Sequence, residues 1–282
     1  MKFHLNTAEV YIPDEMPVGQ ALARTTHLCI AAHQDDIEIM AAQPIIECFQ
    51  QKDKWFTGVV VTDGRGSPRD SLYKDYNDEE MRLVRFKEQR KAAFVGEYAA
   101  QIMLDHPSKS VKDTTKVEPL EDILSLLKVT KPQFVYTHNL ADKHDTHVSV
   151  ALRVVEAIRR LDRAERPARL VGCEVWRALD WMVDSDKFMM DISSHENLQA
   201  ALLGVFDSQI AGGKRYDLAS MGRRRANATY FESHDVDSTL GLSYGMDMTL
   251  LINDTSMDVP AFVQNFIDHF AQDVKARLAR LV

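Results

Sequence analysis

The stretch "HLCIAAHQDDIEIM", residues 27–40, decides the fold we expect. In this stretch an apolar run is followed directly by a histidine and a cluster of acids. The run "HLCIAA" is typical of a short buried strand, and the residues behind it are typical of a helix, which we predict over 36–51. Soon after His33, three acids stand within the four positions 35–38. Carboxylates this close repel one another, and a bound cation would relieve that repulsion.

The same alternation of strand and helix signals continues along the chain. Apolar, strand-like runs lie at 55–64, 99–104, 133–138, 170–176 and 187–193, and helical patterns at 78–96, 118–129 and 147–161. This order predicts an α/β fold, a Rossmann-like, mostly parallel sheet flanked by helices on both faces. We expect a single domain over residues 27–282, preceded by an N-terminal arm over 1–26.

Three of the predicted strands end in unusually polar sequence: "HQDD" (33–36), "TDGRG" (62–66) and "THNLADKHDTH" (137–147). In open α/β sheets, ligands bind beyond the carboxyl ends of the strands. We therefore expect these three segments to converge on one site.

The histidines of this site are spaced like metal ligands. His33 and Asp36 are three positions apart, as are His144 and His147, and side chains at that spacing share a helix face. Three of these four residues would make a two-histidine, one-carboxylate site with open positions, which suits catalytic zinc and also non-haem Fe(II). Each pair has a simpler explanation: acids favoured at a helix N-terminus, and a histidine in a solvated turn.

Composition excludes several classes of protein. A net charge of −8 argues against nucleic-acid binding. The apolar runs are too short for a membrane span, and the first residues lack the apolar core of a signal peptide. Three widely spaced cysteines do not make a disulfide framework. We expect a cytoplasmic protein.

The motifs, taken in order, resemble those of the LmbE-like, or PIG-L, zinc-dependent N-deacetylases. "AHQDD-x-E" is similar to the family's AHPDDE signature, and "RFKEQRKAAFVG" to its R-x-x-E helix. "FVYTHNLADKHDTH" is similar to the strand followed by H-P-D-H, and "DSQ" near 208 to a later S-Q. The resemblance covers roughly residues 27–210.

Carried over to matching positions, the resemblance implies roles for particular residues. His33, Asp36 and His147 would bind Zn²⁺ (or Fe²⁺ or another divalent metal). Asp35 would be the general base, and His144 would orient the reacting group or supply a proton.

Two departures from the family pattern concern the same loops. Gln34 stands where proline is usual, which changes the stiffness of the loop but no ligand. Thr146 replaces the acid before His147, an acid that would support a histidine from outside the metal's ligand set, so Asp145 or another residue must serve instead. Asp142 stands two residues before His144, where some relatives have tyrosine.

Other residues near the strand ends are candidates for substrate binding. Arg85 is implied by the resemblance, whereas Arg65, Lys143, Asp63 and Asn139 follow from their positions beside the predicted site. Arginine and lysine would suit an anionic substrate, and the Asp and Asn side chains could hydrogen-bond sugar hydroxyls. The alternative for each is a solvated loop charge, or for Asp63 a turn-forming residue.

Two further segments have more than one interpretation. The basic stretch 212–234 could close over an anionic substrate, form an oligomer interface or be a solvated helix face, and we favour the first two. The C-terminal helical stripe that begins at Phe262 and continues through Phe266, Phe270 and Val274 is most simply core packing, with a subunit contact as the second option. We expect a homo-oligomer.

The leading hypothesis is a metal-dependent hydrolase that uses metal-activated water to remove the acetyl group from an N-acetylated amino sugar of the GlcNAc type, or from its conjugate. Its substrate would be a small molecule, and neither nucleic acid nor a membrane span is expected. An alternative on the same fold is a zinc-dependent hydratase or lyase of a small unsaturated dicarboxylic acid. A non-catalytic sugar-binding protein is the third interpretation.

Overall fold

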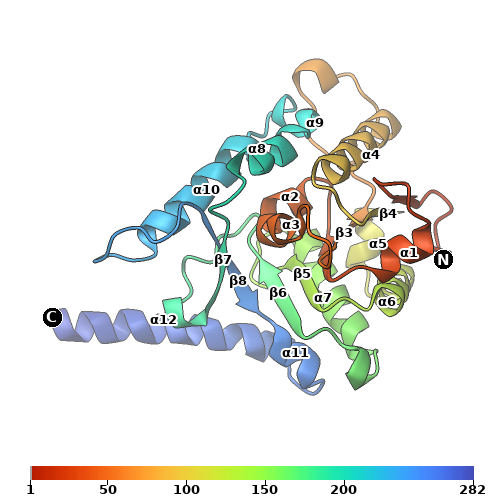
Figure 1. Cartoon of the computed structure of the whole chain (residues 1–282). Helices are drawn as coiled ribbons and strands as arrows, with labels where there is room; N and C mark the ends of the chain where they lie inside the picture. Colours follow the sequence, from red (N-terminus) through yellow and green to blue (C-terminus); the bar gives the residue numbers. More distant parts are fainter. Residues whose placement is uncertain (1) are drawn as a thin grey trace.

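Five neighbouring strands run parallel at the centre of one sheet, as the alternation of strands and helices predicts (Figure 1). The structure, a computed structural model, describes residues 2–282 and orders the strands β1-β4-β3-β2-β5-β6-β8-β7. β1 pairs antiparallel with β4 at one edge, and β8 pairs antiparallel with β6 and β7 at the other. The strands are β1 (Glu9–Tyr11), β2 (His27–Ala31), β3 (Phe56–Thr62), β4 (Ala100–His106), β5 (Phe134–His138), β6 (Arg169–Cys173), β7 (Lys187–Asp191) and β8 (Leu242–Asp247).

Helices cover both faces of this sheet (Figure 1). Within residues 2–282 they are α1 (Val18–Ala23), α2 (Asp36–Met40), α3 (Ala42–Cys48), α4 (Asp78–Val95), α5 (Ser108–Lys112), α6 (Glu118–Thr130), α7 (Asp145–Arg159), α8 (Glu196–Gly204), α9 (Asp207–Ile210), α10 (Tyr216–Tyr230), α11 (Thr249–Asn253) and α12 (Val259–Leu281). Not one of them combines the length and the apolar character that crossing a membrane requires.

Alternate residues of β2 belong to two separate cores, which is why the whole strand is apolar. Leu28 and Ile30 pack in the cluster that includes α6 and α7, whereas Cys29 and Ala31 pack in the cluster that includes α2, α3 and α4. A strand buried on both faces has no solvent side, so it shows no polar alternation. The apolar run before His33 is therefore the centre of the sheet.

The chain changes direction across the sheet between β2 and β5. After β2 it proceeds through β3 to β4 on one side, and β5 then returns to the other side of β2. At such a switch point the loops after the two neighbouring strands separate and leave a crevice. The segments beginning at His33 and at Asn139 follow these two strands, as predicted.

Several local predictions differ from the structure. The helix predicted over 36–51 is two helices, α2 and α3, separated at Ala41. Pro44 explains the break, because it has no N–H to donate to the carbonyl of Met40 and its ring would clash with that carbonyl. Part of the expected N-terminal arm is structured as β1 and α1, and α1 buries Leu22 in the core.

The core-packing prediction for the C-terminal stripe is wrong beyond the first turns of α12. Phe262 is buried and Phe266 packs against the core, whereas Phe270 and Val274 are exposed. The helix extends past the edge of the domain, so its last turns have no core beneath them (Figure 1).

Candidate metal centre and active site

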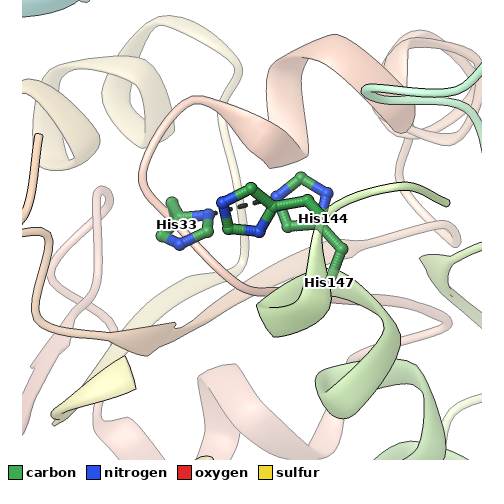
Figure 2. Close-up of side chains that lie close together, drawn as sticks. All are labelled: His33, His144 and His147. Atoms are coloured by element: carbon green, nitrogen blue, oxygen red, sulfur yellow. Dashed lines mark hydrogen bonds between the residues drawn. The ribbon is translucent and has the colours of Figure 1, made fainter. Parts of the chain in front are cut away.

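Three side chains from the two switch-point loops point at one position. His33 Nδ1 lies 3.1 Å from Asp36 Oδ2 and 3.2 Å from His147 Nε2, and these last two atoms are 3.3 Å apart. Figure 2 shows the imidazoles of His33, His147 and the neighbouring His144 turned toward one another. The structure thus brings together, in space, two pairs of residues that are more than a hundred positions apart in sequence.

This triangle has the dimensions of a metal site. Ligand atoms at about 2.1 Å from a tetrahedral zinc ion are about 3.4 Å from one another. The two imidazole nitrogens and the carboxylate oxygen, 3.1–3.3 Å apart, are all atoms of the kind that bind zinc. The residues therefore fit a divalent ion held by His33, Asp36 and His147.

His138 is a neighbour of this triangle with a different function. It belongs, with Asp36 and His147, to a second group of side chains close enough to hold an ion. Its Nε2, however, accepts a hydrogen bond from the backbone N–H of Ala32 at 2.8 Å, so that lone pair is already used. The ring also stacks on His147, with centroids 3.9 Å apart. We therefore assign His138 to support of the site.

Asp35 has a strained backbone and an unpaired carboxylate oxygen. Its φ of 87° is unusual for a residue with a side chain, and such strain is concentrated at functional sites. Oδ2 is buried without a hydrogen bond, 3.6 Å from Arg85 Nη2. Burial raises the pKa of Asp35, opposed mainly by Arg85, to about 7. An oxygen so placed is available to accept a proton from a group in the cavity.

The charges of the triangle stabilise one another. Burial alone would raise the pKa of Asp36, but His147, His33 and His138 hold it well below its usual range. Burial alone would lower the pKa of His147, but Asp36 and Asp142 raise it to about 9. The carboxylate of Asp36 is thus ionised, as a metal ligand must be.

Asp142 lies behind His147, whereas Thr146, the residue before His147, has no carboxylate. Its buried Oδ2 is 3.5 Å from His147 Nδ1, on the side of the ring opposite the triangle, and its Oδ1 accepts the backbone N–H of His144 at 3.0 Å. A carboxylate behind a ligating histidine fixes the orientation of the ring and increases its basicity. Asp145, the alternative, is exposed in the first turn of α7.

His144 lies at the edge of the site beside an aromatic side chain. Its ring centroid is 5.1 Å from that of His33, and the ring is nearly parallel to Trp176 at 6.3 Å. Burial, His147 and His33 lower the pKa of His144. His144 thus lies beside His33 and also lines the cavity.

A cavity of about 460 Å³ opens above these residues. Its floor includes His33, Asp35, Asp36 and His144. The remaining side chains of its wall come from distant segments and include Arg85, Ser108, Lys112, Thr146, Trp176, Gln209, Lys214 and Tyr216. The volume is sufficient for a small organic substrate.

Of the predicted substrate-binding residues, the structure places only Arg85 in the cavity wall. Its Nη2 donates to the carbonyl of Gln34, and its Nε and Nη1 are buried without a partner. Arg65 pairs with Asp63 at 2.9 Å and with Glu79 at 2.6 Å. Asn139 donates to the carbonyl of Cys173 and accepts from Ala141, so its amide serves the backbone.

Lys143 and Asp63 lie outside the lining of the cavity. Lys143 is exposed, with its Nζ 5.8 Å from the centre of the Trp176 ring. Asp63 accepts the backbone N–H of Arg65 at 3.2 Å, as in the turn that was its alternative interpretation. The glycine that follows, Gly64, has φ of +71°, and a Cβ there would meet Gln34 Oε1 at 2.4 Å.

Sequence reasoning missed Lys112 and Trp176, whereas Lys214 and Tyr216 belong to the basic segment 212–234 that was expected to close over an anionic substrate or to form an interface. Trp176 had a signal that could have identified it, because it is the last residue of the predicted strand 170–176, at the same edge of the sheet. Lys112 had none, because its position depends on how α5 packs. Lys214 Nζ lies 5.2 Å from the centre of the Trp176 ring, and Tyr216 meets that ring edge-on.

The arginines of the basic segment 212–234 hold the backbone around the site. Arg224 is buried and donates to the carbonyls of Glu38 and Ile39 in α2, and Arg223 donates to the carbonyl of Val175. Burial lowers the pKa of Arg224 to about 10. The segment therefore fixes α2, the helix that begins with Asp36, and its N-terminal end contributes Lys214 to the cavity.

Fold and site together define an α/β protein with a candidate metal centre at the switch point of a mostly parallel sheet. Residues 28–158 match the model of the PIG-L family, described as GlcNAc-PI de-N-acetylase. The PIG-L, or LmbE-like, match over these residues confirms the resemblance for this part of the chain.

Solved structures with the same fold cover 79% of this chain. The conserved protein TT1542 from Thermus thermophilus has 17% identity, 94% of its own chain covered and a TM-score of 0.59. The N,N′-diacetylchitobiose deacetylase from Pyrococcus horikoshii has 14% identity, 84% of its own chain covered and a TM-score of 0.59. GalB, the 4-carboxy-2-hydroxymuconate hydratase from Pseudomonas putida, has 14% identity, 96% of its own chain covered and a TM-score of 0.58.

Proposed function

We propose that the protein is a zinc-dependent N-deacetylase, a hydrolase that removes the acetyl group from an N-acetylated amino sugar or its conjugate. The observation that carries the proposal is the convergence of His33, Asp36 and His147 beside the unpaired oxygen of Asp35. The PIG-L match and the similarity to a diacetylchitobiose deacetylase support the same class of substrate.

The chain's own residues can carry out the proton transfers of amide hydrolysis. A divalent ion held by His33, Asp36 and His147 would lower the pKa of water and polarise the amide carbonyl. Asp35 Oδ2 accepts the proton of the attacking water, and Arg85, 3.6 Å away, limits the rise in its pKa. Asp35 then passes this proton to the leaving nitrogen, and the imidazole of His144 orients the reacting group. His33 and Asp36 are ligands in this account and do not transfer protons.

The wall of the cavity suits a sugar that carries an anionic group. Trp176, half-buried next to His144, presents an aromatic face that can pack against a sugar ring. No salt bridge among residues 2–282 involves Lys112 or Lys214. Both lysines line the cavity, where they would bind a phosphate or carboxylate of the substrate.

The decisive experiment is acetate release from a panel of N-acetylglucosamine derivatives, with and without an anionic substituent. Activity is expected to disappear with a chelator and to return with Zn²⁺, and elemental analysis of protein purified without added metal distinguishes zinc from iron. Asp35→Asn should reduce kcat by at least about 10²-fold while the metal remains bound. Full turnover by Asp35→Asn would show that Asp35 is not the base.

The cavity also fits a second reaction. A small unsaturated dicarboxylic acid would place its carboxylates near Lys112, Lys214 and Arg85, and the structurally similar GalB is a hydratase of such a compound. Loss of the absorbance of an unsaturated diacid on incubation with the protein, without acetate release from any acetylated sugar, would favour the hydratase.

A further inference from the structure

Helix α12 leaves the domain after its third turn. Phe262 is buried at its start, and near the middle His269 Nδ1 lies 2.7 Å from Asp186 Oδ2 while Phe270 contacts Trp181 edge-on. Beyond these contacts the helix continues to Leu281 and extends past the edge of the domain (Figure 1). A helical segment without tertiary contacts gains little stability from propensity alone.

The exposed part of α12 carries an apolar stripe. Five residues form it, and their exposed fractions range from 39% at Val274 to 79% at Leu281: Ile267, Phe270, Val274, Leu278 and Leu281. At 100° per residue, the five lie within an arc of about 80°. The stripe is about 21 Å long, with Val274 at its centre. A continuous apolar stripe of this kind on an exposed helix marks a contact surface.

The charges beside the stripe identify its partner. Acids occupy the N-terminal half and bases the C-terminal half of this segment. On one flank of the stripe Asp273 is followed by Arg277 and Arg280, and on the other Asp268 is followed by Lys275. In an antiparallel pair related by a two-fold axis at Val274, the same flank of each helix meets its copy, so Asp273 of each helix lies beside Arg277 of the other.

We propose that α12 pairs antiparallel with α12 of a second copy of this chain, with Val274 near the two-fold axis. Phe270 then faces Leu278 of the second copy and Ile267 faces its Leu281, in an isologous contact in which each helix supplies the same residues. The end of each helix reaches the region where the other chain's Trp181 packs on Phe270. The pairing is independent of the proposed reaction, because the stripe contains no residue of the site.

Cysteine cross-linking tests the geometry directly. The native cysteines are all buried, so a cysteine introduced on α12 is the reactive thiol, and the unsubstituted protein is the control. Val274→Cys is expected to form a disulfide-linked dimer of twice the 32.1 kDa chain mass under mild oxidation. Ile267→Cys and Leu281→Cys are expected to cross-link efficiently only when mixed. Efficient self-linking of each would show a parallel pair and overturn the proposal.

Charge reversal tests the specificity in solution. Asp268→Lys/Asp273→Lys makes the segment wholly basic and Lys275→Asp/Arg277→Asp/Arg280→Asp makes it wholly acidic, so each variant should dimerise at least about tenfold more weakly. Mixing the two variants should restore dimers, as should combining all five substitutions in one chain. Sedimentation equilibrium measures the mass, and circular dichroism checks that each variant is folded.

Two results would exclude the pairing. One is a sedimentation mass of one chain for the unsubstituted protein at all concentrations tested. The other is a dimer or larger assembly whose affinity is unaffected by both charge-reversed variants and by Val274→Glu, which would show that another surface holds it together.

Discussion

At the scale of single residues, two acids contact the candidate metal-binding histidines. Asp36 is shared by His33 and His147, whereas Asp142 contacts His147 from the opposite side of its ring. Because Asp142 also accepts the backbone N–H groups of His144 and Trp176, one carboxylate joins the candidate metal-binding loop to the wall of the cavity. The loop therefore keeps a supporting carboxylate without an acid at Thr146.

We expect Asp142→Ala to weaken Zn²⁺ binding about 10–100-fold, because the ring of His147 loses its supporting carboxylate. Competition with a fluorescent zinc chelator measures the affinity. Asp145→Ala is the matched control, because Asp145 is close to Asp142 in sequence but exposed. The Zn²⁺ affinity of this variant should be unchanged. Equal Zn²⁺ affinities for both variants would show that Asp142 does not support the metal centre.

The cavity lysines are expected to act on binding rather than on the reaction step. Lys214→Gln should raise KM several-fold for an anionic amino-sugar conjugate with little change in kcat, and should have little effect on a neutral analogue. Lys109→Gln is the control, because Lys109 is exposed and lies outside the cavity lining. An equal effect on charged and neutral substrates would indicate that Lys214 does not bind an anion.

At the scale of elements, the short helix α2 is held in place by a distant helix. Its five residues begin with Asp36, and its last carbonyls accept hydrogen bonds from the buried Arg224 of α10 at 2.8 Å and 3.1 Å. Gln199 of α8 accepts a third hydrogen bond from the same guanidinium. The position of a candidate metal ligand is thus fixed by a side chain nearly two hundred residues away.

Replacing Arg224 by methionine should reduce the free energy of unfolding by about 3 kcal/mol, because buried carbonyls lose their donor. Zinc affinity should fall as well, since α2 loosens. Urea denaturation measures the first effect and chelator competition the second. Arg225→Met is the control: its guanidinium pairs with Glu196 at the surface, so the expected loss is below about 1 kcal/mol.

At the scale of the whole molecule, a buried acid joins the N-terminal segment to the sheet. Asp122 of α6 lies 2.9 Å from His106 Nε2 in β4 and 2.8 Å from His4 Nδ1, and it accepts the backbone N–H of His4. Burial alone would raise the pKa of Asp122, but His106 and His4 lower it below its usual value. The ionised carboxylate therefore stabilises the folded chain.

The sign of this effect predicts how stability varies with pH. Because the pKa of Asp122 is lower in the folded state, its contribution is present above the unfolded pKa of about 3.9 and is lost as the pH falls through the folded value. Asp122→Asn should lower the free energy of unfolding by about 2 kcal/mol at neutral pH and by progressively less below pH ~4. Urea denaturation at a series of pH values measures both. A cost independent of pH would show that the charge is not involved.

The family motifs and the polar ends of the strands were enough to predict the sheet and the candidate metal-binding atoms. His33, Asp36 and His147 lie next to strand ends in the sequence, and parallel strands bring their carboxyl ends to one edge. The break at Ala41 could have been predicted from Pro44, because a proline in a helix interior removes a hydrogen bond. These features depend on neighbouring residues and on rules for parallel sheets.

By itself the sequence determined the α/β class, the switch-point loops and the candidate ligands, because strand burial and ligand spacing are local properties. Only the tertiary structure decided that Asp142 supports His147, that Arg224 holds α2, and that Lys112, Lys214 and Trp176 surround the cavity. It also decided that the end of α12 is uncovered. Such contacts join residues far apart in sequence, and their formation depends on how whole helices pack.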